Sequence, residues 1–93
     1  MEQRIGFVGI IIENQACVDT VNHLLSAYAE LILARVGLPC RDKGVAVITL
    51  VVEATNDALG ELTGKLGNIT GVSVKSALAK QYKKQAKKPS PLP

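Results

Sequence analysis

Apolar residues recur along the chain with two different periods, which separates predicted strands from predicted helices. Short runs rich in β-branched residues, typical of strands, cover residues 4–13, 31–36, 45–52 and 72–77. Apolar positions in steps of three, four and three, which line one face of a helix, recur over residues 18–28 and 59–69. The pattern therefore predicts the order strand, helix, strand, strand, helix, strand.

Capping and turn residues mark where these elements begin and end. Asn14 and Thr55 each precede a helical stripe, as side chains that cap a helix N-terminus do. Gly67 and Asn68 end the second helix. The glycines and the proline of residues 37–44 predict a turn, so that the second and third strands form a hairpin.

Two strand-helix-strand halves of similar length predict an α+β, ferredoxin-like βαββαβ fold. Right-handed crossovers place the first and third strands in the centre of a four-stranded antiparallel sheet, with both helices on one face. The folded domain is expected to span residues 1–79. Residues 80–93 are rich in lysine and proline and predict a flexible basic tail.

Charge is divided unevenly between these two parts. The chain holds 11 basic and 8 acidic residues, for a net charge of +3. Five of the lysines lie in residues 80–93, so residues 1–79 carry six basic and eight acidic residues. Scattered basic residues on a mildly acidic body argue against direct DNA binding by the folded domain. Nonspecific contact of the tail with nucleic acid or an acidic partner stays open as an alternative.

The strands of the predicted sheet are apolar on both faces, although the helices can cover only one of them. We assign the more polar side of the third strand to the uncovered face, which makes it the predicted oligomer interface: Val45, Val47, Thr49 and Val51. Soluble monomers rarely expose an apolar patch of this size, so we expect a homo-oligomer, either a dimer or a tetramer. The alternatives are misjudged strand lengths or a tail that folds back over the sheet.

Candidate catalytic and metal-binding groups are few. The one histidine, His23, lies six residues after Cys17, which is not a metal-ligand spacing. We therefore expect no metal site and no cofactor. No nucleophile, base and orienting group form a recognisable set, so we expect no enzyme activity. Cys17 and Cys40 are expected to be free thiols, with redox sensing as the alternative role.

Three glycines lie on one face of the second predicted helix, where each costs about 1 kcal/mol relative to alanine. Such a face permits close approach of the sheet, of a neighbouring subunit or of a ligand. The predicted ligand-binding site combines these glycines with the polar turn after the first strand: Glu13, Asn14, Gln15, Gly60, Gly64 and Gly67. A protein-interaction adaptor without a small-molecule ligand is the alternative function.

The location of the protein is expected from the lengths of its apolar runs. None reaches the roughly 18 residues that a membrane helix needs. No small-residue cleavage site follows the first apolar run, so a secretory signal is not expected. We therefore expect a cytoplasmic protein without a membrane partner.

Two segments of the chain, residues 33–39 and 56–75, resemble a known family. They are similar to the small regulators of the iron-only hydrogenase system, which are ACT-like domains also related in fold to the carboxy-terminal domain of the nickel-responsive repressor. The resemblance extends over residues 1 to about 80. It implies a ferredoxin-like regulatory module that assembles into dimers or tetramers, with a sensing role in hydrogenase expression or maturation.

The chain also departs from relatives of this fold. ACT domains that bind amino acids typically carry an Asp-Arg-Pro-Gly-like loop after the first strand, whereas this chain has Glu13-Asn-Gln-Ala16. The histidines of the nickel repressor's metal site and its DNA-binding ribbon-helix-helix segment have no counterpart here. The resemblance therefore implies neither an amino-acid effector nor nickel, and any transcriptional effect would pass through a partner or the tail.

Overall fold

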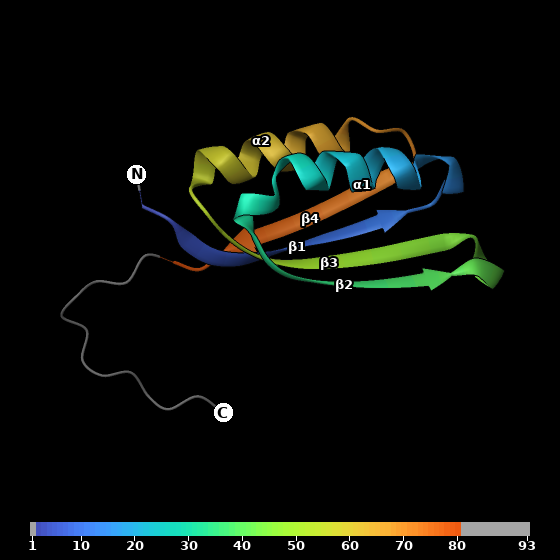
Figure 1. Ribbon diagram of the computed structural model, residues 1–93, viewed down its shortest axis with the longest axis horizontal. Coiled ribbons are helices and arrows are strands. Elements are labelled where there is room, and N and C mark those ends of the chain that lie inside the picture. Colours follow the sequence, from blue (N-terminus) through green and yellow to red (C-terminus); the bar gives the residue numbers. More distant parts are fainter. Residues whose placement is uncertain (1, 81–93) are drawn as a thin grey trace, which may run out of the picture.

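The computed structural model describes residues 2–80 of the chain, apart from the side chains of residues 40 and 41. Two helices lie side by side on one face of a twisted sheet (Figure 1). The elements follow the chain in the predicted order: β1 (Arg4–Ile12), α1 (Val18–Ala27), β2 (Ile32–Cys40), β3 (Val45–Ala54), α2 (Asn56–Gly67) and β4 (Val72–Leu78).

The sheet has the order β2-β3-β1-β4, and each neighbouring pair of strands is antiparallel. The central strands β1 and β3 are thus the first and third strands of the chain, as right-handed crossovers require. This arrangement confirms the predicted α+β, ferredoxin-like fold.

Local hydrogen bonds explain where the helices begin. The N–H of Ala58 donates to the hydroxyl oxygen of Thr55 over 3.1 Å, which caps α2 as predicted. Asn14 caps a short 3₁₀ turn, Gln15–Cys17, because its side-chain oxygen accepts from the N–H of Ala16 over 3.0 Å. The helix α1 therefore begins at Val18, the first residue of the predicted stripe, and not directly after Asn14.

The core lies between the helices and the even-numbered side of the central strands. Its centre consists of side chains that are almost completely buried: Val8, Ile10, Ile12, Val21, Leu25, Leu50, Val52, Leu62 and Leu66. These include the two middle residues of each predicted stripe, since the apolar spacing turns every third or fourth side chain toward the sheet, and Val18, Tyr28 and Ile69 at the stripe ends are partly buried against the core.

The turn predicted over residues 37–44 is wrong in extent. β2 continues through Pro39, which pairs with Ala46 of β3, and the turn is confined to residues 41–44. Proline is tolerated here because β2 is an edge strand, where a missing N–H need not interrupt the sheet. Gly44 closes the turn with a φ of 70°, a value that side-chain-bearing residues rarely adopt.

The predicted tail lies almost wholly outside the described residues, which include only Lys80 of it. Neither described helix is both long and apolar enough to cross a membrane.

Candidate functional site

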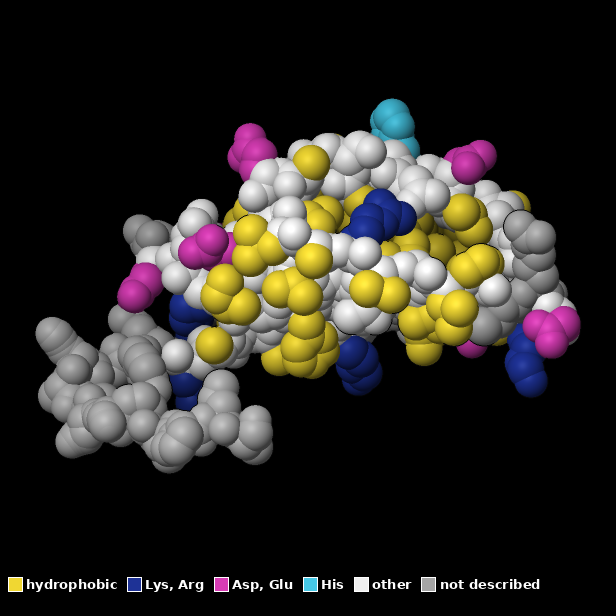
Figure 2. Space-filling view, turned by 60° about the horizontal axis from the view of Figure 1, so that its bottom comes forward, with side chains coloured by type: hydrophobic (Ala, Val, Ile, Leu, Met, Phe, Trp, Pro, Cys, Tyr) yellow, Lys and Arg dark blue, Asp and Glu magenta, His cyan; other side chains and the backbone are white. Residues whose placement is uncertain are grey.

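The face of the sheet opposite the helices, called here the open face, carries six large apolar side chains that are at least two-fifths exposed. They are Ile5, Phe7, Ile11, Val36, Leu38 and Val51. In Figure 2, where the sheet side of the molecule is turned partly forward, apolar side chains are spread across the middle and the lower part of the view. A contiguous group of exposed apolar side chains usually marks an interaction surface, which makes the open face a candidate for one.

The strand register places these side chains in adjoining rows. Phe7 lies between Val51 of β3 and Ala77 of β4, and Ile11 lies between Val47 and Ser73. β2 extends the rows with Ala34, Val36 and Leu38, which pair with Val51, Thr49 and Val47. The open face is therefore mostly apolar from β2 to β1, apart from Thr49 and Glu53 of β3, and becomes polar at β4, where Ser73 and Lys75 lie.

All four residues of the predicted interface lie on the open face. Thr49 and Val51 are exposed, and Val45 and Val47 are partly buried by their neighbours. The structure adds Val36 and Leu38. Leu38 was missed because residues 37–44 are predicted as a turn, and Val36 was missed because the two faces of the predicted second strand were left unassigned. Their alternation with Arg35 and Gly37 was the available signal, since alternate residues of a strand face the same side.

A hollow interrupts the open face at Gly9 of β1. It has a volume of about 220 Å³ and is called here the Gly9 hollow; its lining residues are Gly9, Ile10, Ile11, Val47, Ser73 and Lys75. A Cβ atom added at Gly9 would meet nothing closer than the Lys75 carbonyl oxygen, at 3.8 Å. The hollow therefore exists because glycine has no side chain at a position where one would fit.

The predicted polar turn lies at the carboxyl end of β1, against the loop that joins α2 to β4. The N–H of Glu13 donates to the Gly71 carbonyl over 2.8 Å, and the Cys17 thiol donates to the Thr70 carbonyl over 3.1 Å. Gly71 has a φ of 88°. A Cβ there would also lie 3.0 Å from that of Asn14, so this junction is tightly fitted.

The structure does not bring the predicted glycines together with this turn as one pocket. α2 ends at Gly67, close in the chain to the loop that the turn contacts, whereas Gly60 lies about two helical turns away. A Cβ at Gly60, Gly64 or Gly67 would meet no atom within 4 Å. These glycines therefore face away from the sheet, so close approach of the sheet is excluded, and close approach of a neighbouring subunit or of a ligand stays a prediction.

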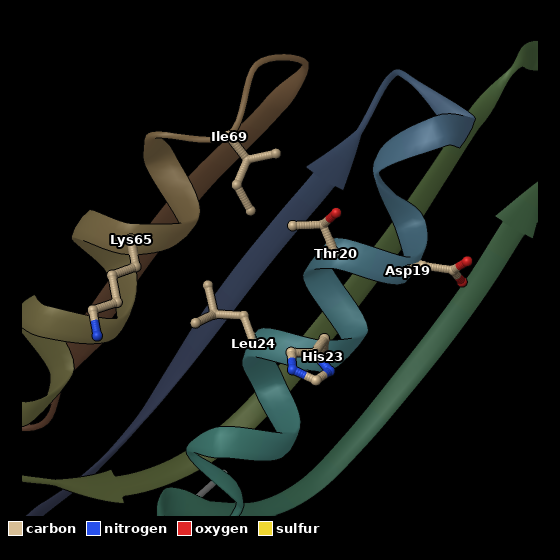
Figure 3. Close-up of a pocket in the computed structure, with 6 residues that line it drawn as sticks. All are labelled: Asp19, Thr20, His23, Leu24, Lys65 and Ile69. Carbon is tan, nitrogen blue, oxygen red and sulfur yellow. The ribbon is translucent and has the colours of Figure 1, made fainter.

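A groove of about 580 Å³ runs between α1 and α2, and it is called here the helix groove. Its lining residues are Asp19, Thr20, His23, Leu24, Lys65 and Ile69 (Figure 3). Thr20 and Leu24 lie on the side of α1 that faces α2, whereas Asp19 projects away from α2. One end of the groove, at Thr20 and Ile69, adjoins the elements that carry the predicted polar turn.

Lys65 brings a positive charge to the helix groove, and Asp19, which projects away from α2, brings a negative charge to its margin. The ammonium nitrogen of Lys65 lies 5.4 Å from the centre of the Tyr28 ring, so the side chain reaches across from α2 to the end of α1. Hydrogen bonding and charge interaction with Tyr28 raise the pKa of Lys65 above its ordinary value. With the imidazole of His23, the hydroxyl of Thr20 and an apolar floor, the groove has the groups to hold a small amphipathic anion.

The two residues considered as metal ligands, His23 and Cys17, do not form a joint site. His23 is exposed on α1, and Cys17 contacts the loop before β4. Within residues 2–80, no three His, Cys, Asp or Glu side chains lie close enough together to hold a metal ion.

Comparison with solved structures supports one close and one distant similarity. The chain shares 41% identity with the uncharacterized protein TM1266 from Thermotoga maritima, over 85% of this chain and 100% of that one, with a TM-score of 0.80. The ACT domain from the GTP pyrophosphokinase of Chlorobium tepidum matches with a TM-score of 0.68 at 18% identity, over 90% of this chain and 97% of that one. The second similarity shows a shared ACT-like fold.

Comparison with family models gives the relationship itself. No curated protein matches the chain. The model of the TM1266-like family, described as "Iron-only hydrogenase system regulator, putative", matches residues 4–76. This range includes every strand and helix apart from the last two residues of β4. The chain therefore belongs to the TM1266-like family of iron-only hydrogenase system regulators.

Proposed function

We propose that this protein is a non-enzymatic, ligand-sensing regulatory module that acts as a homo-oligomer, with the open face as its subunit interface. The exposed apolar side chains of the open face are the observation that carries the proposal. Membership in a regulator family supports the regulatory role.

The open face offers enough burial to hold two copies together. The six exposed side chains amount to about three whole ones, and burying them contributes about 5–9 kcal/mol per copy at roughly 1.5–3 kcal/mol each. Two copies packed face to face therefore gain about 10–18 kcal/mol, against an association cost of about 4–15 kcal/mol. The midpoints of these ranges leave about 4–5 kcal/mol in favour of association, and a micromolar dimer, which needs about 8 kcal/mol, lies in the favourable half of the range.

The helix groove is the proposed ligand site, in place of a pocket built directly from the predicted turn and glycines. Lys65 supplies a cation for an anionic group, and Leu24 and Ile69 supply apolar contact. The groove adjoins the junction between the polar turn and the α2–β4 loop, so the polar part of the predicted ligand-binding site borders the proposed groove. The class of ligand is a small molecule that carries a carboxylate or phosphate beside an apolar group.

Sedimentation equilibrium of the whole chain over a range of micromolar concentrations tests the assembly. Val51→Lys, on the open face, should dissociate the oligomer because it would bury a charge. Ser26→Lys, on the exposed side of α1, is the matched control and should assemble as the wild type does. A wild-type chain that stays monomeric at every concentration refutes the homo-oligomer and leaves the adaptor as the better function.

A thermal-shift screen of amino acids, nucleotides and metal ions tests the ligand site, because a ligand that binds only the folded chain raises its Tm. The shift produced by a bound anion should be lost in Lys65→Met and kept in Lys43→Met, which removes an exposed lysine from the β2–β3 turn. An equal shift in both variants would contradict the proposed groove.

A further inference from the structure

Two neighbouring features of β1 have opposite shapes. Phe7 projects from the open face and is 49% exposed. Gly9, two residues along the same strand and therefore on the same side, opens the hollow of about 220 Å³, which extends from Gly9 toward Ile11. The projection and the depression thus follow each other along the same strand in the centre of the sheet.

A two-fold dimer uses the same surface patch on both copies, so a stable one needs each projection to meet a depression on that patch. We propose that Phe7 of each copy inserts into the Gly9 hollow of a second copy. The two copies are related by a two-fold axis that lies between the two sheets, perpendicular to the strands and level with Val8 of β1. The inference rests on the proposed face-to-face assembly and specifies its register.

The rest of the open face is compatible with this axis. With this axis, each strand lies over the same strand of the second copy, and the two run in opposite directions. Residues equally far from Val8 on β1 then meet, so that Ile5 packs against Ile11 of the second copy. On β3, the register with β1 brings Val51 opposite Thr49 of the second copy. These contacts cover most of the apolar side chains. The charged side chains lie at the margins: Glu53, which the axis brings opposite Val47 of the second copy, lies next to the last residue of β3, and Lys75 lies on the edge strand β4, where its long side chain can reach water.

The size of the hollow favours a side chain over a small molecule as its occupant. Ligand pockets usually span about 300–1,000 Å³, so a volume of about 220 Å³ falls below that range. The hollow is bordered by Ile11 and Val47, which suit an aromatic ring. Phe7 is the aromatic side chain that the described part of the open face presents.

A double-mutant cycle on the whole chain tests the register. Gly9→Val fills the hollow and should raise the dimer dissociation constant about tenfold or more, because the ring of the second copy loses its place. Phe7→Ala should also raise it. The dissociation constant of the double variant should be about tenfold lower than the product of the two single effects predicts, because the valine at position 9 of one copy then occupies the space that the Phe7 ring of the other copy has left.

Gly37→Val is the matched control for the filled hollow. Like Gly9→Val, it replaces a strand glycine by valine, and a Cβ at Gly37 would meet no atom within 4 Å. Gly37, however, lies on the helix-facing side of β2 and not on the open face. It should leave the dissociation constant unchanged. Circular dichroism at each concentration reports whether every variant is folded.

The outcomes separate the register from the assembly. A wild-type chain without a dimer defeats the assembly and the register together. A wild-type dimer that Gly9→Val weakens no more than Gly37→Val does overturns the register alone, as do single effects that simply combine in the double variant. Recovery in the double variant supports the register.

Discussion

Two glycines on β1 should respond in opposite ways to the same small change. A Cβ atom at Gly6 would overlap the carbonyl oxygen of Ala77 and lie 2.9 Å from the Cα of Leu78. Both atoms belong to the backbone of β4, so the strand itself must shift. A Cβ at Gly9 would make only an ordinary contact, at 3.8 Å.

The expected magnitudes follow from these distances. Gly6→Ala should lower the free energy of unfolding by about 1–3 kcal/mol, the usual cost of forcing an extra carbon into a filled site. Gly9→Ala should raise it by about 0.4–1 kcal/mol, because alanine has fewer conformations to lose from the unfolded chain. The two variants should therefore differ by at least about 1.5 kcal/mol, which is about 6 °C or more in Tm for a domain of this size.

Urea unfolding followed by circular dichroism measures this difference. It should be done at a protein concentration too low for association, since assembly would add to the apparent stability. Gly37→Ala, with open space around the new carbon, serves as the control. Equal stability of the Gly6 and Gly9 variants would show that β4 does not approach β1 as closely as the structure has it.

Three further changes test the helices. Thr55→Ala should cost about 0.5–2 kcal/mol, because α2 loses its cap, and denaturant unfolding measures it. Leu62→Ala should cost about 2–5 kcal/mol in the same assay, because Leu62 is completely buried. Tyr28→Phe should lower the pKa of Lys65, as NMR titration would show. Because folding raises the pKa of Lys65, the Tyr28 contact stabilises the folded chain fully at pH values below the unfolded pKa of 10.5, and this stabilisation is lost as the pH rises through the higher folded pKa. An unchanged titration of Lys65 in Tyr28→Phe would contradict the contact.

The sequence predicted the fold well because its local signals agree with one another. Thr55 begins α2, and the leucine stripe turns inward as its spacing requires. The extent of β2 could not be predicted in the same way. Gly37 and Pro39 are turn residues in most contexts, and only the pairing of Pro39 with Ala46 at the sheet edge makes them part of a strand.

The candidate site was harder to predict, because it depends on distances between elements. Nothing in the local pattern says that Lys65 would reach Tyr28 across two helices. The cost of the glycines in α2 signalled a special surface, but the pattern did not reveal that Gly60 and Gly64 face outward with open space around them. The hollow at Gly9 likewise depends on its neighbours in β3 and β4, which only the strand register supplies.

The uncovered edge of β2 has a consequence for solubility. It is a nine-residue strand whose outward-lying side chains include Leu33, Val36 and Leu38, each more than half exposed. Edge strands with unpaired backbone groups and greasy side chains can recruit other chains into disordered aggregates, and Pro39 protects only one end of this one. If assembly shields the strand, most of the protein added at high concentration enters the protected oligomer, so aggregation should rise less steeply with concentration than it does for a variant that stays monomeric.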